Sequence, residues 1–535
     1  MGLATLLGVF FGSSQAAFAQ GSYTDDALLF SRQGPAGTAR TLGIGGASTA
    51  LGADFGSLTS NPAGLGFYTK SELTLTPSLG IGNADAAPVA SAASIGAQTS
   101  LTQATNRFHI ANAGVVFANR HPDSDNRAWR GGSFALGFTR LADFNQGFRY
   151  RNITNDDHSF FQFFREPGGY SNYGSQDYQT AVNRIKQQDN TGNYVNLDGL
   201  AYGNYLTSFV RVPSPGRPAR DTTTVLRTAT PLRTGAIQQD ERVLSEGSLS
   251  QFDLGYGGNY RDRLYVGIGL GIVSLNRTRT TSTSESSGTG SDFGEDFNFQ
   301  QSVHTTGTGV NARLGLIYRP VDVVRVGAAI QTPTYIRLEE EYSTTLTSQY
   351  TPANYSNVLS TTPGTNSYYI TTPFRASGGL VVLLNKYGFL SGDIEYVGYS
   401  QARYSIDDTR ANADLNSDLD YANQNISTGY RNTVNLRVGA EGRFDILRVR
   451  LGYAHYGDPY AGQLVDRAQN YYTGGLGIRV RNFFVDATGV YLRYRDQYSP
   501  YTLASGPGTV ANGVSPIIGY TQNRFTASLT GGITF

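Results

Sequence analysis

Few side chains in this sequence are suited to covalent or metal chemistry. The 535 residues contain no Cys, which excludes thiolate catalysis, disulfides and sulfur-ligated metals. Met1 is the only Met, so an axial haem ligand would have to be His or Tyr. The His residues lie far apart and form no convincing Ser/His/Asp set. We therefore expect a protein that is not an enzyme, with no metal and no cofactor. Its five His are His109, His121, His158, His304 and His455.

A cluster of aromatic residues is the clearest candidate for contact with an apolar ligand. Residues 160–164 contain four Phe within a long polar connection, and such a patch is costly to leave in water. We interpret these rings as a capture groove on the extracellular side: Phe160, Phe161, Phe163 and Phe164. The alternative is a self-contained loop core in which they pack against Val182, Ile185 or Phe209.

Most of the chain consists of stretches in which apolar and polar residues alternate. In the last stretch, Phe525, Leu529 and Ile533 have one parity, and Thr526 and Thr530 have the other. The stretches have the length that a tilted membrane strand requires. There are fourteen, an even number, as a closed bacterial barrel needs. They are 71–80, 107–118, 132–141, 250–259, 263–278, 300–319, 322–340, 371–385, 388–405, 431–443, 447–457, 470–480, 483–496 and 521–534.

The connections between these stretches alternate in length. Tight turns are expected at 260–262, 320–321, 386–387, 444–446 and 481–482. Longer loops are expected at 142–249, 279–299, 341–370, 406–430, 458–469 and 497–520. Short turns on one rim and long loops on the other are typical of outer-membrane barrels. The sequence therefore predicts an all-β fold, a fourteen-stranded antiparallel transmembrane β-barrel.

The charge distribution agrees with a barrel. The 42 basic and 41 acidic residues form no basic block, which argues against a nucleic-acid partner. The longest apolar runs, such as 265–275, are too short for a spanning helix. Within the strands, charged residues lie on the parity opposite the apolar ones and should face the lumen, either as a selectivity ring or as braces for the barrel. They are Asp393, Glu395, Arg437, Glu441, Arg448, Arg450, Arg479 and Asp486.

The N-terminal 70 residues divide into two segments. Residues 1–19 have an apolar run followed by Ala17-Phe18-Ala19, which predicts a signal peptide cleaved before Gln20. Residues 20–70 are rich in Gly and precede the first strand, so we expect them to plug a lumen that fourteen strands leave open. The remaining domain, 71–535, is the barrel, with 142–249 as its large extracellular loop. Export with neither a spanning helix nor Cys leaves the periplasm, the outer membrane or the exterior. Together with the predicted barrel, it predicts a location in the outer membrane of a Gram-negative bacterium.

Several motifs resemble those of a known family. They are Thr38–Ala47, Ala53–Ser57 and Asn61–Leu65 near the N-terminus, and Arg313–Pro320, Gly392–Tyr396, Asn435–Glu441 and Arg450–Tyr453 in the barrel. The chain thereby resembles the FadL/TodX outer-membrane transporters, in the branch found in Bacteroidetes-type bacteria. This resemblance implies an N-terminal hatch inside a fourteen-stranded barrel and passive import of long-chain fatty acids or aromatic hydrocarbons. It also implies capture by the loops, hatch movement and lateral release at a kinked third strand.

The resemblance also suggests functional residues. The family's hatch site would consist of Asn61, Pro62, Ala63 and Gly64. By their residue types these four form a turn capped by the Asn side chain. The alternative is that this turn only wedges the plug in place. The lateral exit would lie near Asn145 and Gly147, since Gly in a strand often marks a bulge.

Other readings remain open from the sequence. Some relatives are labelled hemin receptors, and others serve as scaffolds in secretion. An unspecific porin or a barrel enzyme is less compatible with a plugged lumen and scattered His. The expected partners are a hydrophobic small molecule, outer-membrane lipid and lipopolysaccharide, and the assembly machinery, which would read the terminal Phe535. The family suggests a monomer.

Overall fold

A computed structural model describes most of the chain. The described residues are 16–122, 124–125, 127–160, 172–173, 178–213, 222–228, 235–287, 294–351, 355–407, 413–462, 465–503 and 514–535. Most of the predicted signal peptide, residues 1–19, lies outside them. Among the described helices, none has the length and apolar character needed to cross a membrane.

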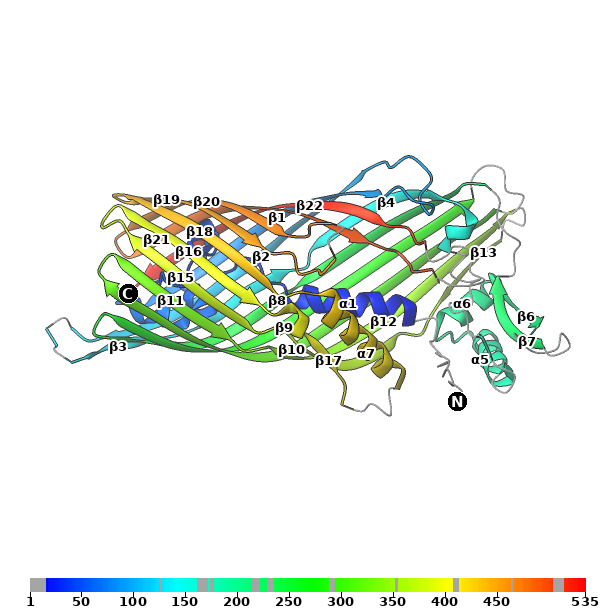
Figure 1. Cartoon of the computed structure of the whole chain (residues 1–535), viewed down its shortest axis with the longest axis horizontal. Coiled ribbons are helices and arrows are strands. Elements are labelled where there is room, and N and C mark those ends of the chain that lie inside the picture. The colour runs from blue at the N-terminus through cyan, green and yellow to red at the C-terminus, as the bar shows by residue number, and fades with distance from the viewer. Residues whose placement is uncertain are drawn as a thin grey trace, which may run out of the picture.

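The strands form one closed antiparallel barrel of fourteen wall strands, as predicted (Figure 1). The barrel closes because β1 pairs with β22, from Glu72 opposite Thr534 to Pro88 opposite Ile518. The unbroken wall strands are β1 (Glu72–Pro88), β2 (Leu101–Arg120), β8 (Ile237–Tyr260), β9 (Leu264–Ser287), β10 (Gly294–Val321), β18 (Thr433–Phe444), β19 (Leu447–Tyr456), β20 (Gln469–Val480), β21 (Phe483–Tyr498) and β22 (Ile518–Thr534).

The other four wall strands are interrupted. They are β3 (Trp129–Asp143) with β4 (Gln146–Thr154), β11 (Val324–Gln331) with β12 (Tyr335–Thr351), β14 (Gly364–Thr371) with β15 (Arg375–Leu383), and β16 (Gly388–Val397) with β17 (Arg403–Ser405). Each pair continues along the same neighbouring strand or strands. The predicted loop 142–249 was therefore too long, because β4 and the first half of β8 belong to the wall.

The two ends of the barrel differ, as the connection lengths predict. We call the rim with the short turns, where the C-terminus lies, the tight-turn end (Figure 1). Left-handed backbone at Arg261, Asp262 and Asn385 makes these turns compact, with φ of 55°, 56° and 50°. The opposite rim, the loop end, carries β13 (Tyr355–Ser360), α7 (Ala413–Gly429), η2 (Asp156–His158), η3 (Tyr399–Gln401), α5 (Tyr178–Thr191), α6 (Leu197–Gly203) and a small sheet of β5 (Asn172–Tyr173), β6 (Thr207–Pro213) and β7 (Thr222–Thr228).

The outer face of the wall is apolar and the inner face is polar. Along β1, Leu73 and Leu75 are about half exposed, whereas Glu72, Thr74 and Thr76 between them are buried in the lumen. The same alternation runs along β9, where Ile268, Leu270 and Ile272 face outward. An apolar outer face on a closed barrel is what contact with lipid requires.

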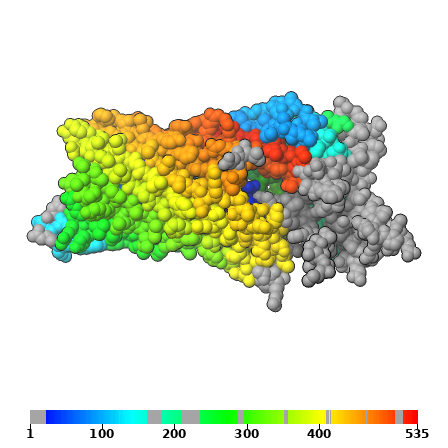
Figure 2. Space-filling view, viewed as in Figure 1, coloured from blue at the N-terminus to red at the C-terminus, as the bar shows by residue number. Residues whose placement is uncertain are grey.

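The N-terminal segment lies inside the barrel (Figure 1, dark blue). It consists of α1 (Ala16–Ser31), α2 (Ala39–Gly43), α3 (Ser57–Ser60) and η1 (Pro62–Phe67). Helix α1 packs on α7 near the loop end, where Tyr23, Ala27 and Phe30 share one apolar cluster with Leu419 and Ala422. In Figure 2 a small part of this segment is visible in a hollow between the wall and α7.

Candidate functional site

The turn Asn61-Pro62-Ala63-Gly64 fastens the N-terminal segment to the wall. The Asn61 side chain is 1% exposed; its Nδ2 donates to the carbonyl of Thr49 at 2.7 Å and to that of Leu316 at 3.2 Å. Its Oδ1 accepts from the Ala63 backbone N–H at 3.1 Å. One amide thus ties together two parts of the segment and strand β10.

The wall is shaped to receive this turn. Gly257, Gly267 and Gly315, on three successive wall strands, press against it, and a Cβ at any of them would collide with atoms of Asn61 or Pro62 or their neighbours. These glycines lie at the tight-turn end. The turn lies outside the lining of the cavity described below, and a hatch site at Asn61, Pro62, Ala63 and Gly64 stays a prediction.

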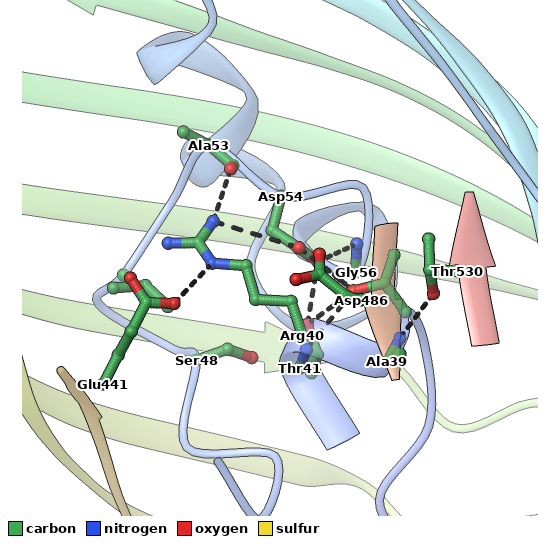
Figure 3. A network of polar contacts seen from close by, with 12 residues as sticks. Ala39, Arg40, Thr41, Ser48, Ala53, Asp54, Gly56, Glu441, Asp486 and Thr530 are labelled. Atoms are coloured by element: carbon green, nitrogen blue, oxygen red, sulfur yellow. Dashed lines mark hydrogen bonds and ion pairs between the residues drawn. The ribbon is translucent and has the colours of Figure 1, made fainter. Parts of the chain in front are cut away.

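Arg40 is a second anchor of the same segment (Figure 3). It donates from Nη1 to the Ala53 carbonyl at 2.7 Å and from Nε to Glu441 of the wall at 3.4 Å. Asp54 lies 3.9 Å from Arg40 and accepts from the backbone N–H of Gly56 at 2.8 Å. Ala39 donates its N–H to Thr530 at 2.7 Å. Two neighbouring residues of α2, Ala39 and Arg40, thus attach this helix to Thr530 and Glu441 of the wall.

Five of the eight lumen charges predicted from parity form ion pairs within the wall: Glu395, Arg437, Glu441, Arg450 and Asp486. Arg450, whose side chain is fully buried, lies 2.7 Å from Glu441 and 2.6 Å from Asp486. Further along the wall, Glu395 lies 3.2 Å from Arg437 and 3.6 Å from Arg375. Partners at these distances brace the barrel and the plug, which favours bracing over a selectivity ring.

A cavity of about 290 Å³ lies on the loop side of these anchors. Helix α1 and the linker Gly34–Gly37 form one side of it, and the lumen faces of the wall strands form the other. Its walls combine apolar and charged side chains. The apolar and aromatic ones include Leu28, Leu42, Leu141, Phe144, Phe148, Val490, Leu492, Tyr471, Tyr494, Tyr498 and Tyr520. A partly open space with aromatic, aliphatic and charged walls has room for a small or slender ligand that has apolar surface.

Asp25 of α1 has an unusual environment in this cavity. Its side chain is open to the cavity but enclosed by the barrel. Burial, followed by repulsion from Asp496, raises the pKa of the Asp25 carboxyl to about 7. Its neighbour Asp26 is instead paired with Arg277 at 2.6 Å. Asp25 can therefore exist in either protonation state near neutral pH.

The third wall strand breaks beside the cavity. Strand β3 ends at Asp143 and β4 begins at Gln146, so the sequence-predicted Asn145 lies within the break. Its side chain spans the gap: Nδ2 donates to the Asp143 carboxylate, and Oδ1 accepts from the Gly247 N–H at 3.4 Å. Gly247 adopts a φ of 126°, which only glycine takes readily. Gly147, the other predicted residue, lies inside β4 rather than at the break.

The wall is incompletely hydrogen-bonded at this break. Strand β2 pairs with β3 only from Arg120 to Asn112, opposite Gly131 to Thr139. Beyond that point, residues 101–110 of β2 pair with β1 after a bulge at Ala111, and β4 pairs with β8. Phe148 and Tyr150 of β4 pack behind β1 against Ala84 and Ala86, so β4 runs inside the line of the wall. Within the described residues, β2 and β4 share no ladder.

Only one of the four predicted capture residues is described. Phe160 is 1% exposed and packs against Phe297, Phe299 and Tyr501, with ring centroids 5.4–5.6 Å apart. It belongs to a loop core that includes Ile185. Its ring is therefore not presented to water as a capture groove would require. Phe161, Phe163 and Phe164 lie outside the described residues.

The His residues form no shared site. His158, His304 and His455 each bond locally, to Val514, Thr278 and Asn470. Only His109 lines the cavity. The described part of the chain holds no group of three His, Asp or Glu placed to bind a metal.

Sequence reasoning missed the cavity residues, although a signal for some of them was present. Val490, Leu492 and Tyr494 have the same parity as Asp486, so their lumen position follows from the alternation along β21. Their approach to α1 does not follow from that pattern.

Comparisons with known proteins place the fold. No family model and no curated protein matches the sequence. Among solved structures, a FadL homologue of Pseudomonas aeruginosa has a TM-score of 0.53 at 12% identity, covering 94% of this chain and 99% of its own. The toluene transporter TodX of P. putida has a TM-score of 0.51 at 13% identity, with the same coverage. The chain therefore has the fold of the FadL/TodX outer-membrane transporters, and with its apolar outer face it is an outer-membrane β-barrel.

Proposed function

We propose that the protein imports hydrophobic small molecules, such as long-chain fatty acids or aromatic hydrocarbons, passively across the outer membrane. One observation carries the proposal: the aromatic cavity reaches the break in the third wall strand, where β2 and β4 share no ladder in the described chain. A ligand in the cavity thus has a short path to the surrounding lipid. The solved structures of similar fold support this reading, since their names describe a FadL homologue and a toluene transporter.

The route has three stages. A ligand enters from the loop end past α1 and α7 and settles in the cavity. The plug below, held by Asn61 and Arg40, blocks passage through the tight-turn end. The ligand leaves sideways at the break, and transfer into lipid supplies ~0.8 kcal/mol per buried CH₂. No energy source other than this partitioning is needed.

The surroundings of the barrel complete the proposal. Lipid and lipopolysaccharide cover the apolar outer face, and the barrel works as a monomer. Phe535, which is 62% exposed beside Ser71, is the residue that the assembly machinery would read.

Uptake by whole cells tests the proposed function. A Gram-negative host without its own hydrophobe channel, carrying this chain, should take up tritiated dodecanoic acid or radiolabelled toluene several-fold faster than the host with an empty vector. Uptake of a hydrophilic sugar should not change, because the plug fills the lumen. Equal uptake of hydrophobic probes with and without the protein would contradict import, and faster sugar uptake would indicate an open pore.

A further inference from the structure

An ion pair crosses the outer side of the break in the third wall strand. Arg107 of β2 and Glu246 of β8 lie 3.2 Å apart, from Nη2 to Oε1. Their strands share no ladder in the described chain, because β3 lies between them up to the break and β4 then pairs with β8 alone. Neither residue lines the cavity, although the nearby His109 and Ser245 do. The pair therefore lies just outside the cavity, where the proposed route leaves it.

The β8 side of the pair is held firmly by the break itself. Gly247, the residue after Glu246, accepts at its carbonyl from the Phe144 N–H at 3.0 Å and donates its own N–H to Asn145 at 3.4 Å. A Cβ at Gly247 would collide with the Asn276 carbonyl of the next strand. Contacts on both sides thus fix the backbone beside Glu246.

The β2 side of the pair is less firmly held. Past the bulge at Ala111, residues 101–110 pair with β1 along one edge, and their other edge has no ladder partner among the described residues. Arg107 lies in this section, opposite Gly80 of β1. Its side chain is 50% exposed, and that of Glu246 is 59% exposed. The ion pair thus ties a free strand edge to a fixed point of the wall.

Other charges at the break are held on its inner side. Asp143, the last residue of β3, lies 3.9 Å from Arg140 and 3.6 Å from Arg524. All three line the cavity, whereas Arg107 and Glu246 do not. The inner charges therefore pair with one another and leave the outer two to each other.

The outer face of the barrel becomes polar at the level of this pair. On β2, the exposed Phe108 is followed toward the loop end by Asn106 at the next outward position. On β8, the exposed Phe252 is followed by Ser250. Charged side chains cost little at such an interface compared with the centre of the bilayer. The two charges can therefore separate there without being left unpaired in the hydrocarbon of the membrane.

We propose that the ion pair of Arg107 and Glu246 is a latch, which closes the strand break toward the membrane and opens to let a ligand pass from the cavity into lipid. Ion pairs between exposed side chains are weak, so thermal motion separates them readily. A weak latch suits a passive channel, because partitioning of the ligand is the only driving force. This inference rests on the proposed import function and concerns the regulation of its exit.

Reversing one charge at a time tests the latch. R107E places two carboxylates face to face, and E246R two guanidinium groups, so each variant should hold the break open. Initial uptake of radiolabelled toluene, which has no charge of its own, should rise at least twofold in both. The double variant R107E/E246R restores an opposite pair and should return to the wild-type rate.

The matched control is R263E. It breaks an ion pair of similar exposure at the tight-turn end, where Arg263 lies 3.4 Å from Asp322 and is 49% exposed. Uptake should stay at the wild-type rate, because this pair is remote from the break. An equal rise in R263E and R107E would mean that any lost surface pair loosens the barrel, and would overturn the latch.

The opening itself can be measured without uptake. Because the chain has no Cys, spin labels at A104C on β2 and R242C on β8 report the width of the break in the purified protein. Both positions are exposed. The distribution of distances between the labels should extend to longer values when R107E is added. Adding R107E and E246R together should restore the original distribution.

The two measurements separate the latch from the import function. Unchanged distances in both single variants would overturn the latch and leave hydrophobe import standing. A wider break without faster uptake would also overturn it, because the pair would then not limit release. A double variant that fails to recover would show that the two charges do not act as a pair. Absence of toluene uptake by the wild type would contradict the proposed function, whereas the label distances would still decide whether the pair holds the break closed.

Discussion

Arg40 of the N-terminal segment reaches Glu441 of the barrel wall, with Nε 3.4 Å from the carboxylate. Glu441 also lies 2.7 Å from Arg450, whose other partner is Asp486 at 2.6 Å. The side chains of Arg40, Glu441 and Arg450 are 9%, 2% and 0% exposed. Arg443 of the wall pairs with the other oxygen of Glu441 at 2.9 Å, so the N-terminal segment adds a third cation to a charge network of the wall.

Replacing Arg40 with Met should loosen the plug. Removing one partner of a buried ion pair costs about 3–5 kcal/mol, because the remaining charge is left buried. The wall retains Arg443 and Arg450 beside Glu441, so we expect a cost at or below the lower end of that range and an intact barrel. Single-channel conductance in planar bilayers should rise from near zero to measurable openings. R40K, which keeps the charge, should show fewer openings; closed channels in R40M would contradict the role of this anchor.

Replacing Asn61 with Leu should free the same segment by a different route. The substitution leaves the carbonyls of Thr49 and Leu316 without the Asn61 donor, at about 1–3 kcal/mol for a buried unsatisfied group. Limited proteolysis should then cut within residues 20–70. The barrel itself should stay folded, so that its mobility in gel electrophoresis still changes on heating as in the wild type. G267A should have a similar effect from the wall side, since its Cβ would collide with Pro62 and Ala63. Resistance of both variants to the protease would exclude the wedge role.

Gly147→Val should slow uptake by displacing β4. A Cβ at Gly147 would lie 2.6 Å from Cδ2 of Leu244 and 3.3 Å from the carbonyl oxygen of Val243, so either the Leu244 side chain or β4 itself must move beside the break. Gly531→Val is the matched control, because no atom lies within 4 Å of a Cβ placed there. Initial uptake rates of tritiated dodecanoic acid should fall severalfold in the first variant only. Equal rates in both would remove β4 from the transport path.

The stability of the plug should depend on pH through Asp25. Its pKa is raised to about 7 in the folded protein and is near 3.8 otherwise, so the folded state binds the proton more tightly. The favourable contribution is complete below the unfolded pKa and is lost as the pH rises toward 7. Thermal unfolding of the plug, followed by proteolysis of residues 20–70, should occur at lower temperature at pH 8 than at pH 5. In D25N this difference should shrink; an unchanged difference would mean that another group titrates.

The alternation of side chains predicted the barrel but not its interruptions. Phe525, Leu529 and Ile533 show the lipid face of the last strand plainly, because a period of two depends only on local sequence. The stretch 322–340 reads as one strand, yet it breaks at residues 332–334, where Thr332 and Thr334 bond to Ala312 and Thr372. Such breaks depend on hydrogen bonds to neighbouring strands, and they leave no mark in the alternation of apolar and polar residues along the sequence.

The candidate site was less predictable than the fold. Asn61 was predicted from its turn chemistry and by resemblance, and Asn145 by resemblance and from the nearby Gly147. The structure shows what each side chain bonds to, and their roles in transport stay predictions. The role of Phe160 could not be decided from the sequence, since four Phe in a polar loop fit a capture groove or a loop core equally well. Arg140 and Arg524 are 384 positions apart and meet only because the barrel closes β22 onto β1 beside the broken third strand.

Lateral release can be tested by closing the break. Past the end of the β2–β3 ladder at Asn112 and Thr139, a bulge at Ala111 turns Ala111 toward the lumen, and Ala111 and Leu141 both line the cavity at the break. Because the chain has no Cys, an A111C/L141C pair can be linked specifically with a short bifunctional thiol reagent cleaved by reductant. The A113C/F138C pair, opposite each other in the existing ladder, is the control.

The measurement is the initial uptake of tritiated dodecanoic acid before and after linking, with the link verified by mass spectrometry. Lateral release predicts that linking residues 111 and 141 abolishes uptake, that reductant restores it, and that linking residues 113 and 138 has no effect. Undiminished uptake with residues 111 and 141 fully linked would contradict lateral release and direct attention to a path through the plug.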